Sequence, residues 1–358
     1  MKIAFICELA GTKRHGGEQY AMLRLADELK LLNNEVDIYS YTTNDSNFKI
    51  KSIIPLKFRL LPFVRDIFFI SIIGKNLLRK IDGKYDTIVC SSTTISSFYK
   101  SKTKLVTICH IIRSQKFNVL SKIPKYKLFF NPITFFLMSS LEQKSLNNSH
   151  QVVVIREHQK EFLVKNLKVN SNKITRIPNG VDSNLFKPRL VEKKYHLIFV
   201  GRGTILKGLD TLLKSADKIH GKILIVTKLI EPRLLTLAQS KSNIKIIFNA
   251  SSEELALLYN QSEIFILPSH DEEQPLTVLE AMSSGLPVIV TQKAASDIVK
   301  NNINGIIIDN SETKIYSTSS LLIKNKKMME KMSENNRDKV LKYYSKTKIV
   351  SEIQNILL

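Results

Sequence analysis

The chain has 358 residues, of which 43% are hydrophobic and 24% are charged, a composition that suits a folded protein with two cores. Its 54 lysines and arginines outnumber the 32 aspartates and glutamates, and the net charge of +22 suits an anionic partner such as nucleic acid, an acidic membrane or a phosphorylated ligand. No window reaches the roughly 18 uncharged apolar residues of a membrane span, and the N-terminal apolar run is too short for a signal peptide. The three cysteines lack the spacing of a metal site. We therefore expect a cytoplasmic protein with buried free thiols.

Short β-branched runs alternate with helical patterns along the chain. Most of the runs are apolar without alternation, as in strands that are buried on both faces of a parallel sheet. The predicted strands cover residues 2–7, 35–40, 86–92, 104–110 and 151–155, and then 196–201, 222–227, 243–248, 263–268 and 287–291. Helices are predicted over residues 18–33, 206–219, 251–261 and much of 311–358. The alternation predicts an α/β fold with two doubly wound parallel sheets.

The phrase IPNGVDSNLFKP marks the boundary between the two predicted sheets. Its Asn179-Gly180 pair is a turn signal, and prolines stand on both sides. We expect an N-terminal domain over residues 1–178 and a C-terminal domain over residues 179–340. A last helix over residues 341–358 is expected to pack back on the N-terminal domain.

Two candidate site segments lie in the first half. Gly16 and Gly17 stand between the first strand and the first helix, where glycine lets the backbone approach a ligand closely. An ordinary glycine-rich turn is the alternative. His110 ends a predicted strand, at the sheet edge where α/β folds bind ligands. A purely structural histidine is the alternative there.

Arg202 and Lys207 lie in the turn that follows the first strand of the second half, beside Gly203 and Gly208. Two cations at such a turn can hold a diphosphate and stabilise it as a leaving group. The alternative is a solvated basic loop, the usual environment of these side chains. The chain has neither the dinucleotide-binding pattern G-x-G-x-x-G nor the P-loop pattern.

Two glutamates, Glu272 and Glu280, stand eight residues apart around a predicted helix start. The residue before a proline is biased away from helix, so Gln274 is expected in the loop, and Pro275 suits the first helical position. A glycine and a proline at 285–287 end the helix. Glu272 therefore precedes the helix, and Glu280 lies one to two turns inside it.

The same helix start offers hydrogen-bond donors. The backbone N–H groups of Gln274, Leu276 and Thr277 lie together there, and with the helix dipole they suit a phosphate. Carboxylates nearby can accept hydrogen bonds from sugar hydroxyls. The alternative is an acidic loop that only stabilises the helix N-terminus.

Taken in this order, the motifs resemble those of family 4 of the retaining nucleotide-sugar glycosyltransferases. That family has the GT-B fold, an α/β fold of two Rossmann-like domains facing across a cleft. The resemblance covers nearly the whole chain. It rests on Gly16-Gly17, His110, IPNGVDSNLFKP, Arg202 with Lys207-Gly208, and the E-x7-E element from Glu272 to Glu280 followed by AMSSGLPVI.

The resemblance implies a role for each residue. Arg202 and Lys207 would hold the donor diphosphate, Glu280 the nucleotide ribose, and Glu272 would lie beside the transferred sugar. Gly16 and Gly17 would close over the phosphates, and His110 would lie beside the reacting sugar. The implied catalytic residues are His110, Glu272, Arg202 and Lys207. The implied donor-binding residues are Gly16, Gly17, Arg202, Lys207, Glu272, Gln274, Pro275, Leu276, Thr277 and Glu280.

The chain departs from the family at two places. Glu273-Gln274 stands where many members have Gly-Phe, which bears on the contacts to the donor sugar, and Arg156 stands where a serine is common. No D-x-D sequence occurs, which fits a metal-independent enzyme that needs no cofactor besides its UDP- or GDP-sugar substrate. The family is thought to transfer sugar with retention, with the leaving diphosphate accepting the proton of the acceptor hydroxyl.

Other functions remain open. A GT-B nucleotide-sugar epimerase would favour an acidic pair placed for elimination, and a phosphorylase a lysine for a bound cofactor. An inactive sugar-binding relative is the third alternative. A nucleic-acid-binding protein would suit the charge, but such proteins interleave aromatic and basic residues or carry a recognisable module, and this chain does neither, so nucleic acid is not expected as a partner.

The acceptor is expected to be a glycan or a lipid-linked precursor. Residues 48–80 carry eight basic side chains and one acidic one, residues 100–144 carry nine and one, and both stretches are rich in apolar residues. Apolar faces edged with lysine and arginine suit an anionic membrane surface. We therefore expect a peripheral enzyme on the inner face of the cell membrane, the alternative being that both stretches are buried helices with a basic rim.

Overall fold

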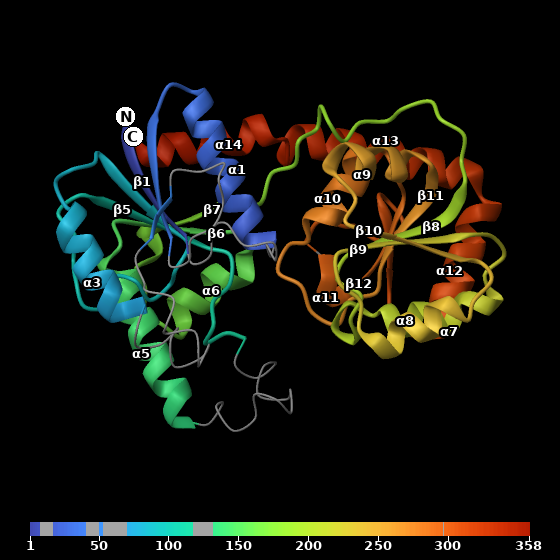
Figure 1. Cartoon of the computed structure of the whole chain (residues 1–358), viewed down its shortest axis with the longest axis horizontal. Coiled ribbons are helices and arrows are strands. Elements are labelled where there is room, and N and C mark those ends of the chain that lie inside the picture. The colour runs from blue at the N-terminus through green and yellow to red at the C-terminus, as the bar shows by residue number, and fades with distance from the viewer. Residues whose placement is uncertain (8–16, 41–49, 53–69, 117–131, 296) are drawn as a thin grey trace. The chain divides into compact units, whose positions relative to one another are not determined.

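The computed structural model describes residues 1–7, 17–40, 50–52, 70–116, 132–295 and 297–358. The chain forms two compact units. Unit 1 contains Met1–Pro178 and Val350–Leu358, and unit 2 contains Asn179–Ile349. In each unit a parallel sheet is enclosed by helices (Figure 1).

Unit 1 has a seven-stranded sheet in the order β3-β2-β1-β4-β5-β6-β7. All of its neighbouring strands are parallel. The strands are β1 (Lys2–Cys7), β2 (Glu35–Ser40), β3 (Ile50–Ser52), β4 (Thr87–Cys90), β5 (Lys104–Cys109), β6 (Gln151–Val154) and β7 (Ile174–Arg176). The buried runs in β1, β4 and β5 confirm that central strands of this sheet are covered on both faces.

The helices of unit 1 are α1 (Gly17–Leu31), α3 (Ile70–Ile81), α5 (Pro132–Asn148) and α6 (Glu157–Lys165). Leu77 and Leu78 of α3 pack with Ala4 and Ile88 of the sheet. Another cluster joins Leu146 of α5 and Leu163 of α6 to Cys109, Val152 and Val154. These contacts supply most of the driving force for the folding of unit 1, because each large aliphatic side chain that is buried stabilises the folded state by roughly 1.5–3 kcal/mol.

Unit 2 has a six-stranded parallel sheet in the order β10-β9-β8-β11-β12-β13. The strands are β8 (Tyr195–Val200), β9 (Ile223–Thr227), β10 (Ile244–Phe248), β11 (Ser262–Leu267), β12 (Val288–Thr291) and β13 (Gly305–Ile308). The helices are α7 (Leu209–Ser215), α8 (Pro232–Gln239), α9 (Ser252–Asn260), α10 (Leu276–Ser283), α11 (Gln292–Ala295), α12 (Glu312–Lys324) and α13 (Lys326–Tyr343). One continuous core cluster runs through the sheet and these helices. The α/β fold of two Rossmann-like units is thus the fold that the sequence predicts.

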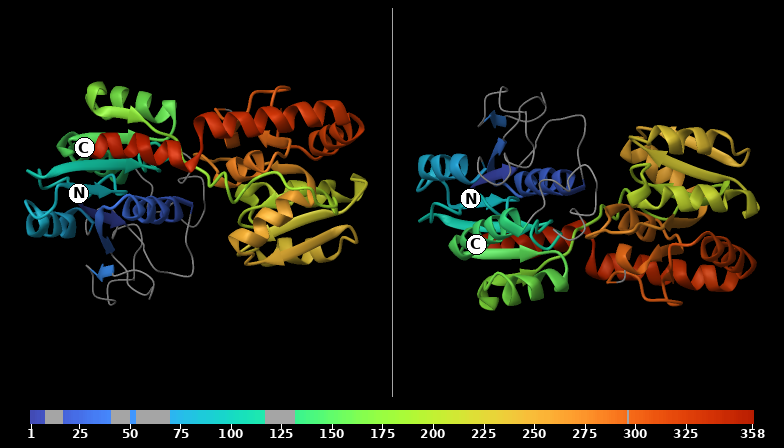
Figure 2. Two further views of the ribbon diagram at one scale, coloured as in Figure 1. Left: turned by 90° about the horizontal axis from the view of Figure 1, so that it is seen from above. Right: turned by 90° about the horizontal axis from the view of Figure 1, so that it is seen from below.

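The chain returns to unit 1 at its end. Helix α14 (Lys346–Leu357) starts in unit 2, where Lys346 forms an ion pair with Asp182 at 2.8 Å. Its last turns belong to unit 1, where the Thr87 hydroxyl donates to the carbonyl of Leu357 at 3.0 Å. Figure 2 shows both chain ends in this unit. The return begins at Val350 rather than at residue 341, because residues 341–349 are held by contacts within unit 2.

The sequence pattern missed three strands, β3, β7 and β13. Two of them have only three residues, too few for a periodic signal, and β13 follows directly on a turn. Cys7, Cys90 and Cys109 are buried thiols, as expected. Among the residues that the structure describes, none of the helices combines the length and apolar character needed to cross a bilayer.

Candidate functional site

Strands β8 and β11 are neighbours at the point where the strand order of unit 2 reverses. The chain runs from β8 outward through β9 and β10 and then returns to β11 on the other side of β8. Doubly wound sheets bind ligands at the carboxyl ends of such a strand pair. Residues 201–208 follow β8 and residues 268–275 follow β11, so both motifs that are predicted to bind a donor have residues at this switch point.

Two glycines fix the course of the loop after β8. The Gly203 N–H donates to the Leu229 carbonyl at 2.7 Å, and the Gly203 carbonyl accepts from the Glu231 N–H at 2.8 Å. Gly208 has a φ of 73°, and a Cβ there would lie 1.9 Å from the Pro268 carbonyl oxygen. Only glycine therefore lets the loops after β8 and β11 approach each other so closely.

Lys207 ends a 3-10 turn (Ile205–Lys207) in this loop, and its Nζ donates to Oε1 of Glu272. The two side chains are 17% and 10% exposed, so the ion pair is largely withdrawn from water. The structure thus brings Lys207 and Glu272 together. Arg202 lies in the same loop as Lys207, and its side chain is exposed.

The loop after β11 is fastened to the residue that precedes Lys207. The Ser269 hydroxyl and the His270 N–H both donate to the Leu206 carbonyl, at 3.0 and 2.9 Å. The Thr291 hydroxyl at the end of β12 in turn donates to the Ser269 carbonyl at 2.5 Å. Three strand ends therefore hold the Lys207–Glu272 pair in place.

Helix α10 starts at Leu276, one residue later than the sequence predicts. Pro275 is its N-cap, with φ −69° and ψ 119°, and is not the first helical residue. The extended ψ of the proline delays the helix, since its carbonyl first accepts from the Val278 N–H at 3.2 Å. The N–H groups of Leu276 and Thr277 then stand at the helix start, where helix geometry supplies no acceptor and the dipole is positive. A phosphate suits this position.

Gln274 is bound to the first residue of unit 2. Its Oε1 accepts from the Asn179 N–H at 2.5 Å, and its carbonyl accepts from the Asn179 Nδ2 at 3.2 Å. The side chain is buried. Asn179, which the sequence marked only as a turn, therefore fixes the approach to α10.

Glu280 lies on the buried side of α10, next to Tyr259 of α9. The Tyr259 hydroxyl contacts Oε2 of Glu280 at 3.1 Å and the Thr277 carbonyl at 3.2 Å. Burial and the neighbouring carboxylate of Glu280 raise the pKa of the Tyr259 hydroxyl well above its ordinary value. The tyrosine thus remains a proton donor at neutral pH and holds the carboxylate of Glu280.

In unit 1, Gly17 is the first residue of α1, and Gly16 lies outside the described residues. His110 directly follows β5 and is buried. Its carbonyl accepts from Nε2 of Gln159 at 3.1 Å. His110, Arg202, Lys207 and Glu272 therefore lie in segments that follow strands β5, β8 and β11, whereas Glu280 lies inside α10.

Four residues around these sites were missed by the sequence analysis: Asn179, Tyr259, Gln159 and Glu142. The first three hold Gln274, Glu280 and His110, respectively. Glu142 accepts hydrogen bonds from Thr93, Arg113 and Ser114, which lie 28 to 49 residues away, so it has no local sequence signal. Asn179 alone lies in a motif that the sequence singled out.

Arg156, which departs from the common serine, is the N-cap of α6 and is buried. Gln159 in the first turn of that helix accepts from the N–H groups of Ile155 and Arg156 at 3.0 and 3.1 Å. The capping of α6 therefore depends on Gln159. No group of three or more histidine, cysteine or acidic side chains in metal-binding arrangement occurs among the described residues.

Two family models match adjoining parts of the chain. The model for Glycosyltransferase Family 4 matches residues 15–185, and that for Glycosyl transferases group 1 matches residues 181–339. Together they cover the glycine segment, His110 and both motifs of the unit 2 site.

The proteins to which the chain is similar include two bacterial transferases and one solved structure. The UDP-Gal:alpha-D-GlcNAc-diphosphoundecaprenol alpha-1,3-galactosyltransferase of Escherichia coli is 24% identical over 234 residues, which are 58% of this chain and 60% of that protein. The N,N'-diacetylbacillosaminyl-diphospho-undecaprenol alpha-1,3-N-acetylgalactosaminyltransferase of Campylobacter jejuni is 27% identical over 228 residues, with the same coverage. The matched part of the chain thus spans 60% of the length of these relatives.

Sucrose-phosphate synthase of Thermosynechococcus elongatus has a similar structure. The TM-score is 0.80 with 16% sequence identity, and the match covers 99% of this chain and 98% of that one. The similarity extends over both units and identifies the fold.

Proposed function

Since the chain belongs to the GT-B glycosyltransferases of the family 4 type, we propose that it moves a hexose from a UDP- or GDP-sugar to a hydroxyl group of a lipid-linked or cell-surface glycan precursor, with retention of the anomeric configuration. The observation that carries this proposal is the group of polar residues at the switch point of unit 2. There the Lys207–Glu272 pair and the start of α10 follow two adjacent strands, and the Tyr259–Glu280 contact joins α9 to α10.

The site offers matching groups for each part of a nucleotide sugar. Arg202, Lys207 and the N–H groups at the start of α10 suit the diphosphate. Glu280, oriented by Tyr259, suits the ribose hydroxyls, and Glu272 suits a sugar hydroxyl. The names of both relatives state a diphosphoundecaprenol acceptor, and one states a UDP-galactose donor, which supports the choice of lipid and nucleotide.

The proposed transfer needs the site mainly to stabilise charge. The bond between the anomeric carbon and the diphosphate oxygen breaks, and its electron pair stays on the diphosphate. The acceptor oxygen forms the new bond on the same face, and its proton passes to a diphosphate oxygen. Arg202, Lys207 and the helix dipole stabilise the developing negative charge, a contribution that is worth roughly 3–4 kcal/mol for a single donor in other enzymes. His110 is assigned to the reacting sugar.

The pairing of Glu272 favours a transferase over an epimerase. An epimerase that works by elimination needs a carboxylate free to remove a proton. In this structure the Glu272 carboxylate is bound by the Lys207 ammonium, so it is not free to remove a proton. The same pair suits the binding of a neutral sugar beside a charged diphosphate.

Release of nucleoside diphosphate tests the proposed function. The purified protein is incubated with a panel of UDP-, GDP- and ADP-sugars, with and without a lipid extract, and release of each diphosphate is measured. We expect release from one nucleotide class, stimulated by the extract, and an α-configured product from an α-configured donor. Interconversion of the free nucleotide sugar without diphosphate release would indicate an epimerase instead.

We also propose that the enzyme binds the surface of an anionic membrane through unit 1. The first half of α5 carries four exposed apolar side chains, Ile133, Phe135, Phe136 and Leu137, which are 72%, 39%, 72% and 38% exposed. Burial inside unit 1 therefore does not account for them. The net charge of residues 1–185 is +15, and each cation near an anionic surface adds about 1 kcal/mol. The rest of the two basic-apolar stretches, residues 53–69 and 117–131, lies outside the described residues.

A further inference from the structure

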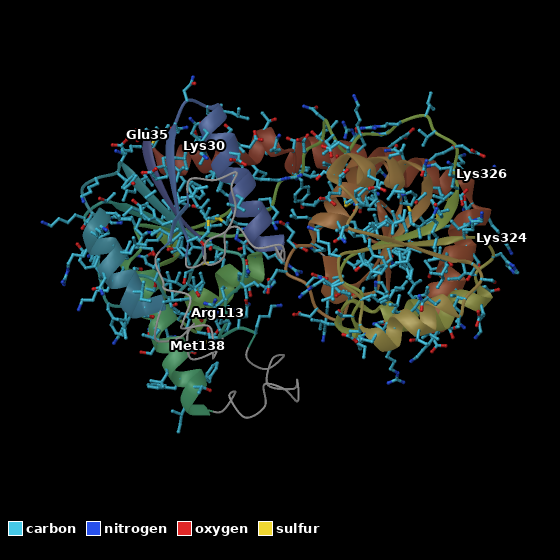
Figure 3. The ribbon with its side chains drawn as sticks, viewed as in Figure 1. Lys30, Glu35, Arg113, Met138, Lys324 and Lys326 are labelled. Atoms are coloured by element: carbon cyan, nitrogen blue, oxygen red, sulfur yellow. The ribbon has the colours of Figure 1, made fainter. Side chains whose placement is uncertain are left out.

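A buried carboxylate on α5 holds the loops that follow β4 and β5. Glu142 is 0% exposed, and its two oxygens accept four hydrogen bonds. The donors are the Thr93 hydroxyl at 2.6 Å, the Arg113 N–H at 2.9 Å, and the N–H of Ser114 at 3.0 Å together with its hydroxyl. A buried carboxyl group is tolerated only when such donors surround it, so the four hydrogen bonds fix Glu142 and the two loops relative to each other. Figure 3 labels Arg113 in this loop and Met138 on α5.

The loop after β5 is also held at its beginning. Gln159, which is 0% exposed, donates from Nε2 to the His110 carbonyl at 3.1 Å. Its Oε1 accepts from the N–H groups of Ile155 and Arg156, so the orientation of the amide is determined by these neighbours. The segment from His110 to Ser114 is therefore fastened at both ends by buried side chains of two different helices.

We propose that Glu142 and Gln159 are positioning residues that hold His110 in its productive orientation. The proposal rests on the proposed function, because it takes His110 to lie beside the reacting sugar. A short loop that is fixed at both ends by buried hydrogen bonds cannot shift without breaking one of them. A displacement of about 1 Å at a reacting group can lower a rate roughly 10²-fold, so this anchoring has a direct effect on transfer.

Unit 1 contains a matched control for the Glu142 cluster. The Asp82 carboxylate also accepts from two hydroxyls and two backbone N–H groups. These donors, the Tyr99 and Ser101 hydroxyls and the N–H groups of Lys102 and Thr103, precede the amino end of β5. A variant at Asp82 or Ser101 thus loses the same kind of bond at the opposite end of the strand from His110.

Four single variants separate positioning from stability. Ser114→Ala and Ser101→Ala each remove one hydroxyl that donates to a carboxylate. Gln159→Glu keeps an oxygen for the N–H groups of Ile155 and Arg156 but cannot donate to the His110 carbonyl. Glu142→Gln is a more severe change than Ser114→Ala, because it alters the acceptor of all four hydrogen bonds. If the Glu142→Gln variant does not fold, Ser114→Ala tests the same cluster. In addition, His110→Gln assigns the His110 signal in the NMR spectrum of the imidazole groups.

The first measurement compares kcat, the KM for the nucleotide sugar selected by the donor panel, and thermal midpoints. We expect Ser114→Ala and Gln159→Glu to lower kcat by about tenfold or more while the donor KM changes less than about twofold. Ser101→Ala is expected to lose a similar amount of thermal stability and to keep its kcat. Equal kcat values for Ser114→Ala and Ser101→Ala would overturn the proposal, as would a loss confined to the donor KM.

The second measurement does not require activity. We expect the ring resonances and the titration curve of His110 to change in Ser114→Ala and Gln159→Glu and to stay unchanged in Ser101→Ala. Unchanged His110 resonances in the first two variants would overturn the proposal. A wild-type protein that releases no diphosphate from any donor would refute the proposed function instead, and the NMR comparison would still decide whether the two side chains control His110.

Discussion

The ammonium of Lys207 donates to the carboxylate of Glu272 across two loops of unit 2. The sequence assigned the lysine to the donor diphosphate and the glutamate to the donor sugar, so two residues with separate predicted roles neutralise each other in this structure. Binding of a diphosphate beside Lys207 therefore has to redistribute this ion pair, and the freed carboxylate becomes available to a sugar hydroxyl.

Replacement of Lys207 by alanine should affect both activity and stability. We expect transfer to fall by roughly 10²-fold or more, because a charge-assisted contact to the diphosphate is lost. We also expect a loss of about 1–3 kcal/mol in the free energy of unfolding, because the carboxylate of Glu272 is only 10% exposed and loses its ion pair with Lys207. Denaturant unfolding and diphosphate release measure the two effects.

Two controls distinguish these effects. The double variant Lys207→Ala/Glu272→Gln should recover part of the stability and none of the activity. Lys241 pairs with Asp217, whose side chain is 66% exposed, and Lys241→Ala should cost less than about 1 kcal/mol and leave transfer unchanged. Near-normal turnover in Lys207→Ala would contradict the assignment of this residue.

Glu272 and Glu280 should differ in what they control. We expect Glu280→Ala to abolish transfer and weaken nucleotide binding with the fold intact, since Glu280 is assigned to the ribose. Glu272→Ala should lower transfer more than it weakens binding of the nucleoside diphosphate. Calorimetric titration with UDP or GDP checks both, and an equal loss of binding in the two variants would count against a sugar-side role of Glu272.

The tyrosine beside Glu280 provides a milder test. Tyr259→Phe removes the hydroxyl that contacts Glu280 and the Thr277 carbonyl, and it should weaken nucleotide binding by up to about tenfold, or roughly 1.4 kcal/mol. Tyr85→Phe, which removes a hydroxyl bound to Asp37 in unit 1, is the control and should leave nucleotide affinity unchanged. Equal affinities for wild type and Tyr259→Phe would show that the ribose contact does not need this hydroxyl.

Transfer should continue in excess EDTA. In the proposed mechanism, Arg202, Lys207 and the start of α10 supply the fixed positive charge that a divalent cation supplies in other transferases. Diphosphate release is measured before and after chelation, and then after addition of Mg²⁺ or Mn²⁺. Loss of activity that either cation restores would contradict a metal-independent mechanism.

Stability should fall in acid partly through Asp82. Burial raises the pKa of this carboxyl, but the N–H groups of Lys102 and Thr103 and the Tyr99 hydroxyl outweigh it and hold the pKa well below its ordinary value of 3.8. Because the folded pKa is depressed, the stabilisation is present above pH 3.8 and is lost as the pH falls through the folded value. Asp82→Asn should flatten the dependence of unfolding free energy on pH below 3.8, and an unchanged slope would rule out this contribution.

The protein should float with anionic vesicles at low salt and be released by high salt. Replacement of the exposed Phe136 by serine should weaken this binding, while the same change at Phe248 of unit 2, which is 48% exposed, should not. Flotation on phosphatidylglycerol vesicles, with neutral phosphatidylcholine vesicles as the reference, measures the effect. If the protein does not bind anionic vesicles at low salt, the proposed membrane binding is wrong, and transfer would take place to an acceptor in solution.

Most of the fold could be predicted from the sequence, because buried parallel strands appear as short apolar runs and turn residues separate these runs. The sequence pattern missed β3 and β7, which have only three residues each, and it placed Pro275 inside α10 because local preference does not include the extended ψ that the loop imposes. Arg202, Lys207, Glu272 and His110 were selected because each follows a predicted strand, and Glu280 because it stands eight residues after Glu272 in the predicted helix; their roles stay predictions. The roles of Glu142, Gln159 and Tyr259 and the Lys207–Glu272 pair were not predicted, because the contacts of these residues with Ser114, His110, Glu280 and each other join positions that are 21 to 65 residues apart.

The return of residues 350–358 to unit 1 makes unit 2 an insertion, since both of its ends connect to the same neighbour. A shortened chain that stops at residue 178 therefore lacks the segment that binds Thr87, and it should fold less well than its length suggests. We therefore expect residues 179–349 to be the segment that can be exchanged as a whole between related proteins. Chimeras that alter the choice of nucleotide sugar should be joined at two places, after Pro178 and before Val350, rather than at one.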